Sequence, residues 1–511
     1  MLVKTYGSAV QGTNAVTITI ETHIIRGDDF MLVGLPDNAV KESQERIRTA
    51  LLVNGYKYPA GQIVINMAPA DIKKEGAAYD LPLAIGLMAA SEQINPAFIS
   101  DYMMMGELSL DGTLQPIRGA LPIALRAKEM GLKGFILPLQ NAPEAAVVDG
   151  LDVYGMDNIR DVARFLNREQ EVEPLHIDIA GIFNEQTKYD SDFANVLGQH
   201  NVKRALEVAA AGGHNILMVG PPGSGKSMMA KCLPSILPPL TLQEALETTK
   251  IHSVAGIKDV KLSLVTTRPF RSPHHTVTDV ALVGGGQNAM PGEISLAHNG
   301  VLFLDELPEF KRSALEVMRQ PLEDRKIVIS RARISIEYPS TFMLVAAMNP
   351  CPCGHYNDPT HICTCTPSMI HRYLNRISGP LLDRIDIQVE ITPVPTSALQ
   401  SNQLSEPSEK IRERVVKARH IQQERFQDTP NVFSNAQMSS KMMRNYCRLD
   451  QDSLELLRTA VDKFGLSARA YDRILKVART IADLANEEHI LSTHIAEAIS
   501  YRNLDRETWG G

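Results

Sequence analysis

The chain has 511 residues, too many for a single hydrophobic core, so roughly two to four domains are expected. Its 44% hydrophobic and 22% charged residues are ordinary for a water-soluble globular protein. A net charge of −7 excludes a general attraction to polyanions, so any nucleic-acid contact has to come from a local basic surface. No signal-peptide pattern and no apolar run of about 18 residues is found, so we expect a cytoplasmic location with reduced cysteines.

Changes of pattern along the chain predict its domains. Residues 1–170 alternate strand-like and helix-like stretches, which indicates a compact α/β domain. The acidic, irregular residues 171–191 are predicted to be a linker. Residues 192–395 again alternate helices with short buried strands, and residues 396–511 have helical periodicity after a polar start. We therefore expect two α/β domains followed by a helical domain.

A phosphate-binding loop is predicted where GPPGSGKSM follows an apolar strand and precedes a helix. Its glycines let backbone N–H groups approach phosphates, Lys226 would reach the terminal phosphates, and Ser227 would bind Mg²⁺. The residues predicted to bind the nucleotide are Gly220, Pro221, Pro222, Gly223, Ser224, Gly225, Lys226, Ser227 and Met228.

The stretch VLFLDE would supply the carboxylates that phosphoryl transfer needs. A strand over residues 301–304 would deliver Asp305 to the Mg²⁺ and Glu306 to the attacking water. An ordinary buried strand with an acidic end is the alternative, which the phosphate loop disfavours. A third strand ends in Asn349, whose amide would orient the same water, although Asn before Pro is also a common start of a turn.

Three arginines are candidates for meeting the γ-phosphate. Arg384 in LLDRID is the first choice for an arginine finger, which a neighbouring subunit can supply, and Arg376 lies in the same stretch. A surface salt bridge is the alternative for Arg384. Arg469 lies at a predicted helix start in GLSARA, where it would also meet phosphate.

The motifs GPPGSGKS, LFLDE, AAMNP, LLDRID and GLSARA together resemble an AAA+ ATPase of the magnesium-chelatase type. RPFRSPHHTVTDVALVGGG, NPCPCG and RISGPLLDRID further resemble the ComM/YifB family of bacterial Mg-chelatase-like AAA+ proteins, essentially end to end. This resemblance implies a central P-loop α/β domain, a C-terminal helical lid, ATP and Mg²⁺ as cofactors, and a hexameric ring. It also implies that Arg384 acts in trans and that Arg469 is a second sensor, while spacing leaves open whether Arg469 acts in cis or in trans.

The amino-terminal domain is similar to the proteolytic domain of Lon, an α/β fold of the ribosomal S5 domain 2-like type. The similarity lies in IKKEGAAYDLPLAIGLMAA and GELSLDGTLQPIRGALPIALRAKEMG. In Lon-type proteases a Ser follows the glycine of the first motif by two residues and a Lys lies in the second. Here those positions hold Ala78 and Leu121, so peptidase activity is not expected. A binding or assembly platform and a plain structural domain are both open interpretations.

A basic stretch in the ATPase region is the candidate contact with a polymer. KIVIS and ISIEY flank RAR, which predicts two strands around a tight turn. In rings of the resembled family such a hairpin points at the pore, so Arg331 and Arg333 would meet a phosphate backbone. Solvated charges at a hairpin tip are the alternative. A second candidate pore element is RPFRSPHHTVT, with Arg268, Arg271, His274 and His275.

Four of the six cysteines lie in an insertion over residues 351–365. They are Cys351, Cys353, Cys363 and Cys365. Four thiolates at this range suit tetrahedral Zn²⁺, and unmetallated thiols or a redox-labile pair are the alternatives. A metal would make the loop between Asn349 and the candidate arginine fingers Arg376 and Arg384 rigid. Alternatively, the metal-bound loop would itself contact DNA or the next subunit.

The sequence thus predicts a cytoplasmic, ring-forming ATPase that couples ATP hydrolysis to movement along DNA or to its remodelling. The family resemblance implies a branch-migration helicase in homologous recombination. The expected partners are single-stranded or branched DNA, other copies of the chain in a homo-hexamer, and recombination proteins, with no membrane. The alternatives are a chaperone like the magnesium-chelatase motor, which would remodel a protein, and an ATP-dependent protease, which Ala78 disfavours.

Overall fold

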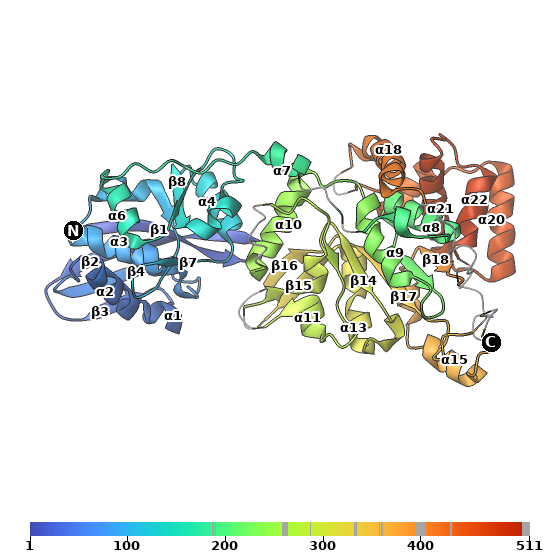
Figure 1. The fold of residues 1–511 in the computed structure, drawn as a ribbon, viewed down its shortest axis with the longest axis horizontal. Helices are drawn as coiled ribbons and strands as arrows, with labels where there is room; N and C mark the ends of the chain where they lie inside the picture. The colour runs from blue at the N-terminus through green and yellow to red at the C-terminus, as the bar shows by residue number, and fades with distance from the viewer. Residues whose placement is uncertain are drawn as a thin grey trace. The chain divides into compact units, whose positions relative to one another are not determined.

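The structure is a computed structural model of the chain. It describes residues 1–185, 189, 191–257, 264–286, 288–331, 335–356, 358, 361–393, 405–429 and 432–502. Contacts divide the chain into two units, which are described separately below (Figure 1). The first comprises residues 1–186, 242–266 and 332–338, and the second comprises residues 187–241, 267–331 and 339–511.

The first unit is built on a seven-stranded mixed sheet in the order β3-β4-β2-β1-β5-β8-β9. Its strands are β1 (Leu2–Gln11), β2 (Asn14–Ile25), β3 (Phe30–Val33), β4 (Gln62–Ala68), β5 (Tyr102–Met104), β8 (Gly134–Pro138) and β9 (Asp152–Met156). The pair β6 (Glu107–Leu108) and β7 (Leu114–Gln115) lies outside this sheet. β1 and β2 are antiparallel, whereas β1, β5, β8 and β9 are parallel to one another.

Helices cover this sheet and close its core. They are α1 (Asn38–Lys41), α2 (Ser43–Val53), α3 (Asp80–Ala90), α4 (Ala120–Glu129), α5 (Ala142–Ala145), α6 (Ile159–Leu166), α7 (Ile179–Glu185) and α10 (Leu242–Ala255). Every residue of α3 is buried, so this helix is the centre of the unit. Its first residue, Asp80, is a buried carboxylate that accepts two hydrogen bonds from Arg46. Helix α10 packs against α4, and Ser253 on α10 donates a hydrogen bond to Glu144.

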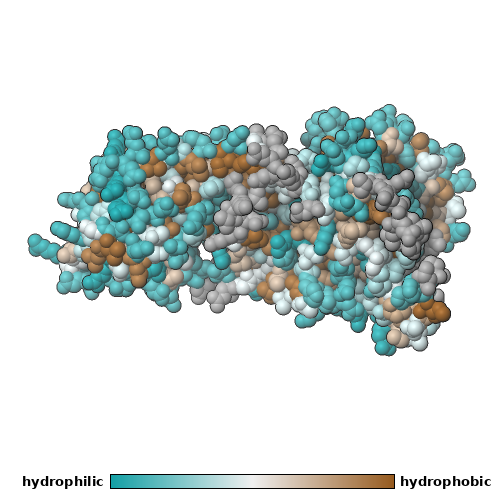
Figure 2. All heavy atoms as spheres, viewed as in Figure 1, coloured by the Kyte–Doolittle hydropathy of each residue, from teal (hydrophilic) through white to brown (hydrophobic). Residues whose placement is uncertain are grey.

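The edge of the first unit exposes apolar side chains. Figure 2 shows a brown patch at the lower left, over α2 and β3. The exposed apolar residues of these elements and their ends are Met31, Val33, Leu35, Leu52 and Val53. This sheet therefore ends in a partly apolar surface. Among the residues that the structure describes, no helix combines the length and the apolar character needed to cross a membrane.

The second unit contains a five-stranded parallel sheet in the order β11-β14-β17-β10-β18. Its strands are β10 (Ile216–Val219), β11 (Phe270–Arg271), β14 (Val301–Leu304), β17 (Met343–Met348) and β18 (Ile387–Glu390). All residues of β10, β14 and β17 are buried, as expected of parallel strands covered on both faces. In register, Val219 pairs with Met348 and Leu304 with Ala346, so the loops that follow these three strands meet at one edge.

Short helices and strands surround this sheet. They are α8 (His200–Gly212), α9 (Lys226–Cys232), α11 (Asp279–Val283), α12 (Glu293–Leu296), α13 (Arg312–Val317), α14 (Arg319–Asp324), α15 (Pro367–Leu374) and α16 (Gly379–Leu382). β12 (Gly284–Gly285) pairs with β13 (Met290–Pro291), and β15 (Lys326–Ser330) also lies in this unit, whereas residues 335–338 of β16 (Ser335–Pro339) belong to the first unit. The two strands predicted around the RAR turn are thus present.

The carboxyl-terminal helices form a compact bundle within the second unit (Figure 1). They are α18 (Ser408–Phe426), α19 (Ser440–Tyr446), α20 (Gln451–Phe464), α21 (Ala468–Leu484) and α22 (Ser492–Ser500). Helix α21 packs against α8, α18 and α22 and is the centre of this bundle. The predicted fold class, an α/β multidomain chain with a parallel-sheet central domain and a helical carboxyl terminus, is confirmed.

A buried carboxylate joins the sheet to the bundle. Asp386 precedes β18 and is 1% exposed. One of its oxygens lies 2.8 Å from Nη1 of Arg473 on α21, and the other accepts the backbone N–H of Asn215 at 3.1 Å. Burial alone would raise the pKa of Asp386, but Arg473 and the neighbouring His214 outweigh it and lower the pKa. The folded protein therefore holds this carboxylate in its charged form.

We predict that Asp386→Asn lowers the free energy of unfolding by about 3 kcal/mol, because Arg473 loses its buried partner. Since the folded pKa lies below the unfolded value of about 3.9, the stabilisation is present above about pH 4 and is lost as the pH falls. Thermal unfolding at pH 7 and below pH 4 tests both statements. Asp383→Asn, at a more exposed carboxylate in the same loop, is the control and should cost less than about 0.5 kcal/mol. Equal effects of the two substitutions would contradict the prediction.

Candidate active site and metal centre

The predicted phosphate loop joins β10 to α9 and has a backbone that glycine permits. Gly223 and Gly225 have φ angles of 74° and 89°. Lys226 is buried, and its Nζ donates to the carbonyl oxygens of Gly220 at 2.7 Å and Pro221 at 2.8 Å. Desolvation lowers the pKa of Lys226. The loop therefore curls around its own lysine, as a cradle for phosphate oxygens requires.

Two further contacts converge on this loop. Oγ of Ser227 donates to Oδ2 of Asp305 at 2.6 Å, and Nζ of Lys226 donates to Oδ1 of Asn349 at 3.2 Å. The structure thus brings together four predicted site residues from the ends of three adjacent strands. A hydroxyl and a carboxylate at this distance are hard oxygen ligands of the kind that Mg²⁺ prefers.

Glu306 follows Asp305 in a left-handed conformation, with a φ of 53°. Its backbone N–H donates to Oδ1 of Asp305 at 3.0 Å, while its side chain is exposed. Oε2 of Glu306 lies 3.2 Å from Nδ1 of His275, whose ring stacks on His274 with the centroids 4.1 Å apart. The strained backbone turns the carboxylate away from the strand and towards His275.

The sequence does not predict the contact of His275 with Glu306; it places His275 only in a candidate pore element. That element also contains two arginines whose bonds lie within the second unit. Arg271 pairs with Glu293 through two hydrogen bonds of 2.7 Å, and Arg268 donates to the backbone oxygen of Asn299 at 2.7 Å. The contact could have been predicted only from the pairing of β11 with β14, because β11 ends four residues before His275 and β14 ends just before Asp305 and Glu306. The order of strands in the sheet is not evident from the sequence.

Arg384 is largely enclosed by its own subunit. Its side chain is 10% exposed, Nη1 donates to the backbone oxygen of Pro380 at 2.5 Å, and Nη2 pairs with the carboxylate of Glu323 on α14. Buried guanidinium groups need such partners. Arg384 thus forms an ion pair with Glu323 in which the arginine is the buried partner, and its role as an arginine finger stays a prediction.

The other two candidate arginines are more exposed. Arg376 pairs with Glu309 at 2.9 Å and lines a polar cavity of about 850 Å³ together with Arg312 and Arg372. Arg469 pairs with Asp383 at 3.1 Å. In the described part of the chain, no hydrogen bond or ion pair joins either of them, or Arg384, to the phosphate loop.

The candidate polymer contact is described only in part. Arg331 is exposed at the end of β15, and its guanidinium lies against Gly285, where an added Cβ would be 2.7 Å from Nη2. Arg333 lies outside the described residues.

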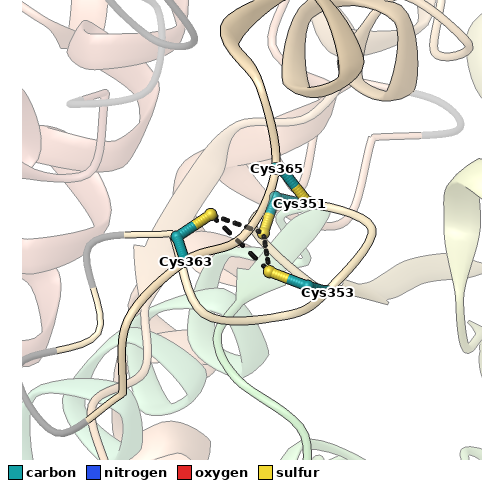
Figure 3. Close-up of side chains that lie close together, drawn as sticks. All are labelled: Cys351, Cys353, Cys363 and Cys365. Carbon is teal, nitrogen blue, oxygen red and sulfur yellow. Dashed lines mark hydrogen bonds between the residues drawn. The ribbon is translucent and has the colours of Figure 1, made fainter.

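The four cysteines of the insertion lie together (Figure 3). Sγ of Cys351 is 3.3 Å from that of Cys353 and 3.7 Å from that of Cys363, and the latter two are 3.6 Å apart. Cys365 completes a group in which all four sulfurs lie within 4.8 Å of one another. Tetrahedral Zn²⁺ with Zn–S bonds of about 2.3 Å places sulfurs about 3.8 Å apart, so the cluster fits this ion.

The backbone around the cluster supports a thiolate. Desolvation raises the pKa of Cys353, but hydrogen bonds from the backbone N–H groups of His355 and Thr364 and from the thiols of Cys351 and Cys365 lower it to about 5. The neighbouring thiols in turn raise the pKa of Cys363, and burial together with these thiols raises the pKa of Cys365, so Cys353 is the thiolate of the group. Metal binding requires thiolates, and N–H donors of this kind commonly accompany them.

The insertion also touches the phosphate loop. Gly354, directly after Cys353, has a φ of 86°, and a Cβ added there would lie 2.5 Å from Cδ of Pro222. On its other side, Cys351 follows Asn349 by two residues. The cysteine cluster is therefore tied to the site through both the end of β17 and the loop.

Three protein-family models match the chain. Residues 20–141 match the family described as subunit ChlI of Mg-chelatase, residues 192–399 match magnesium chelatase, subunit ChlI, and residues 405–502 match its C-terminal family. The second and third of these matches cover the phosphate loop, the cysteine cluster and the helical bundle.

Some relatives match over nearly the whole chain and others over part of it. The competence protein ComM of Haemophilus influenzae is 45% identical over 98% of this chain and 97% of its own length. The uncharacterized protein YifB of Escherichia coli is 44% identical over 98% of this chain and 96% of its own. Lon protease 2 of Bacillus subtilis is 30% identical over 27% of this chain and 25% of its own length.

We predict that Gly354→Ala weakens ATP binding by about tenfold, because the new Cβ pushes the insertion and Pro222 apart. Gly286→Ala is the matched control, since Gly286 has a similar φ of 80° but no atom within 4 Å of an added Cβ. Fluorescent nucleotide titration of both variants checks the prediction. Equal affinities for the two variants would show that the Pro222 contact does not matter.

Proposed function

The chain belongs to the ComM/YifB family of Mg-chelatase-like AAA+ ATPases, and from this premise we propose that it is a ring-forming ATPase that drives movement along DNA or its remodelling. Its proposed activity is that of a branch-migration helicase in homologous recombination, working as a homo-hexamer in the cytoplasm. Its proposed partners are single-stranded or branched DNA and recombination proteins. The observation that carries the ATPase part is the convergence of Lys226, Ser227, Asp305 and Asn349 at one edge of the parallel sheet.

The roles of the site residues follow from their contacts. The loop glycines and Lys226 would hold the phosphates, and Ser227 with Asp305 would hold Mg²⁺, which neutralises charge on the phosphate oxygens. Glu306 would polarise the attacking water, and its carboxylate contacts His275. Asn349 is proposed to orient the same water and to sense the terminal phosphate, and its direct contact with Lys226 supports this role.

Three arginines would complete the reaction around the ring. Arg384 and Arg376 are proposed to act on the nucleotide of the neighbouring subunit, and Arg469 on the bundle is proposed as the second sensor. Arg384 can reach a neighbour only by exchanging Glu323 for the phosphate, since its side chain is 10% exposed. Carboxylate and phosphate are both bidentate acceptors for a guanidinium, so the exchange would replace one acceptor with another of the same kind.

A structural zinc ion is proposed at Cys351, Cys353, Cys363 and Cys365. The sulfur spacing and the backbone donors to Cys353 support it. Such an ion would hold Gly354 against the phosphate loop and fix the segment that follows Asn349.

The amino-terminal unit is proposed to be a platform without peptidase activity. Ala78 and the buried Leu121 stand where the Lon-type pair would be, and neither side chain can act as nucleophile or base. Leu121 instead donates its backbone N–H to Glu144, the same carboxylate that Ser253 contacts. A protein-remodelling activity like that of magnesium chelatase is the second candidate, and the matches to the magnesium chelatase families favour it.

We predict that Glu306→Gln lowers kcat for ATP hydrolysis by about 10²- to 10⁴-fold and leaves ATP binding within about twofold. The amide keeps the shape of the side chain but cannot polarise water as a carboxylate does. Steady-state hydrolysis and nucleotide titration measure the two effects. Asp324→Asn, at an exposed carboxylate outside the site, should behave as the wild type. A kcat reduced less than about tenfold would remove Glu306 from the mechanism.

The DNA-motor proposal predicts that DNA stimulates hydrolysis and that Arg331→Ala/Arg333→Ala loses this stimulation. Rates are measured with single-stranded, duplex and branched DNA across a range of salt concentrations. Removal of two phosphate contacts should reduce the salt slope of the apparent affinity by about 2. Lys441→Ala/Arg444→Ala, at two exposed cations of α19, is the matched control. Rates that no form of DNA changes would favour a protein client.

A further inference from the structure

We propose that the insertion binds a second divalent transition-metal ion, held by His355, Asp358 and His361 and separate from the cysteine cluster. Their ligand atoms lie within 4.8 Å of one another and form a group distinct from the four sulfurs. The proposal needs neither the ATPase nor the DNA activity and is independent of both.

The spacing of the three side chains is that of ligands around one ion. Nδ1 of His355 is 3.0 Å and Nδ1 of His361 is 3.3 Å from the same oxygen, Oδ2 of Asp358. Ligand atoms about 2.1 Å from a common ion are about 3.0 Å apart at a right angle and about 3.4 Å apart at the tetrahedral angle. Both observed distances fall on this scale.

The orientation of the rings supports the same conclusion. The two imidazoles lie 4.7 Å apart with a tilt of 32°, and both direct the same ring nitrogen to one carboxylate oxygen. Without an ion, the same distances describe two N–H groups that donate to Asp358. The metal-bound and the hydrogen-bonded arrangements differ in the number of metal ions bound per chain, which can be measured.

The ligand types and their exposure to solvent indicate which class of metal ion the site would bind. The carboxylate of Asp358 is 2% exposed, whereas the side chain of His361 is 65% exposed, so one side of the site faces water. Two imidazoles and a carboxylate suit Zn²⁺, Fe²⁺ or Co²⁺ and not Ca²⁺ or Mg²⁺, which take oxygen ligands. Three protein ligands leave at least one position for water.

In the sequence, the three ligands of the proposed site lie between the first and the second pair of cysteines. Cys353 is followed by His355 after one residue, and His361 is followed by Cys363 after one residue. The cysteines close the outer loop and the His–Asp–His group closes the inner one.

The test is a Co²⁺ titration of the metal-stripped full chain without a histidine tag, without nucleotide and with excess Mg²⁺ to fill hard oxygen sites. The wild type should bind about two Co²⁺ ions, one with an intense sulfur-to-cobalt charge-transfer band and one with weak visible bands only. His355→Gln/His361→Gln should bind about one and keep the charge-transfer band, which shows that the insertion remains folded. His371→Gln/His420→Gln, at two exposed histidines of the same unit, should still bind about two.

Two results would overturn the proposal. One is a wild-type chain that saturates at a single ion with the charge-transfer band. The other is a His355→Gln/His361→Gln variant that takes up as many ions as the wild type does. In either case the two histidines only donate hydrogen bonds to Asp358.

Discussion

The parallel register of β10, β14 and β17 is the constraint on which the candidate site depends. These strands are buried on both faces, as parallel strands in the middle of a covered sheet are, and hydrogen bonds between them align their ends. The register places the loop after Val219, the carboxylate after Leu304 and the amide after Met348 at one edge of the sheet. The contacts of Lys226 and Ser227 are consequences of this alignment.

The cysteine insertion extends the same edge. It begins directly after the amide-bearing turn, and its backbone at Gly354 lies against Pro222 of the phosphate loop. The cluster is therefore directly connected to the candidate site, on one side through Asn349 and on the other through Pro222. If the four cysteines hold the insertion in one conformation, the adjoining residues of the candidate site are also held in place.

The sequence was most informative where the chemistry is local. The strand, glycine loop and helix around Lys226 are contiguous, so their geometry follows from residue order, and the same is true of Asp305 after its apolar strand. The fold class was likewise predictable from alternating patterns. The placement of α10 against α4 was not predictable, because it depends on packing between segments that are far apart in the chain.

The partners of charged groups were the least predictable part of the site. His275 meets Glu306 only because β11 and β14 are neighbours, and spacing contains no such information. Similarly, nothing in LLDRID indicates that Arg384 would be enclosed by α14. Cysteine spacing, by contrast, predicted proximity correctly because a short loop has few ways to separate its ends.

The pairing of Arg384 with Glu323 has a consequence for assembly. A subunit on its own satisfies this cation internally, so the subunit surface carries less unpaired charge while it is free in solution. Under the proposed role of Arg384 in trans, docking against a nucleotide-loaded neighbour would exchange one anion for another and would not add a new ion pair, so it would have a small net driving force. Because only Arg325 separates α14 from β15, the released carboxylate of Glu323 would lie on the helix that precedes the strand after which Arg331 stands.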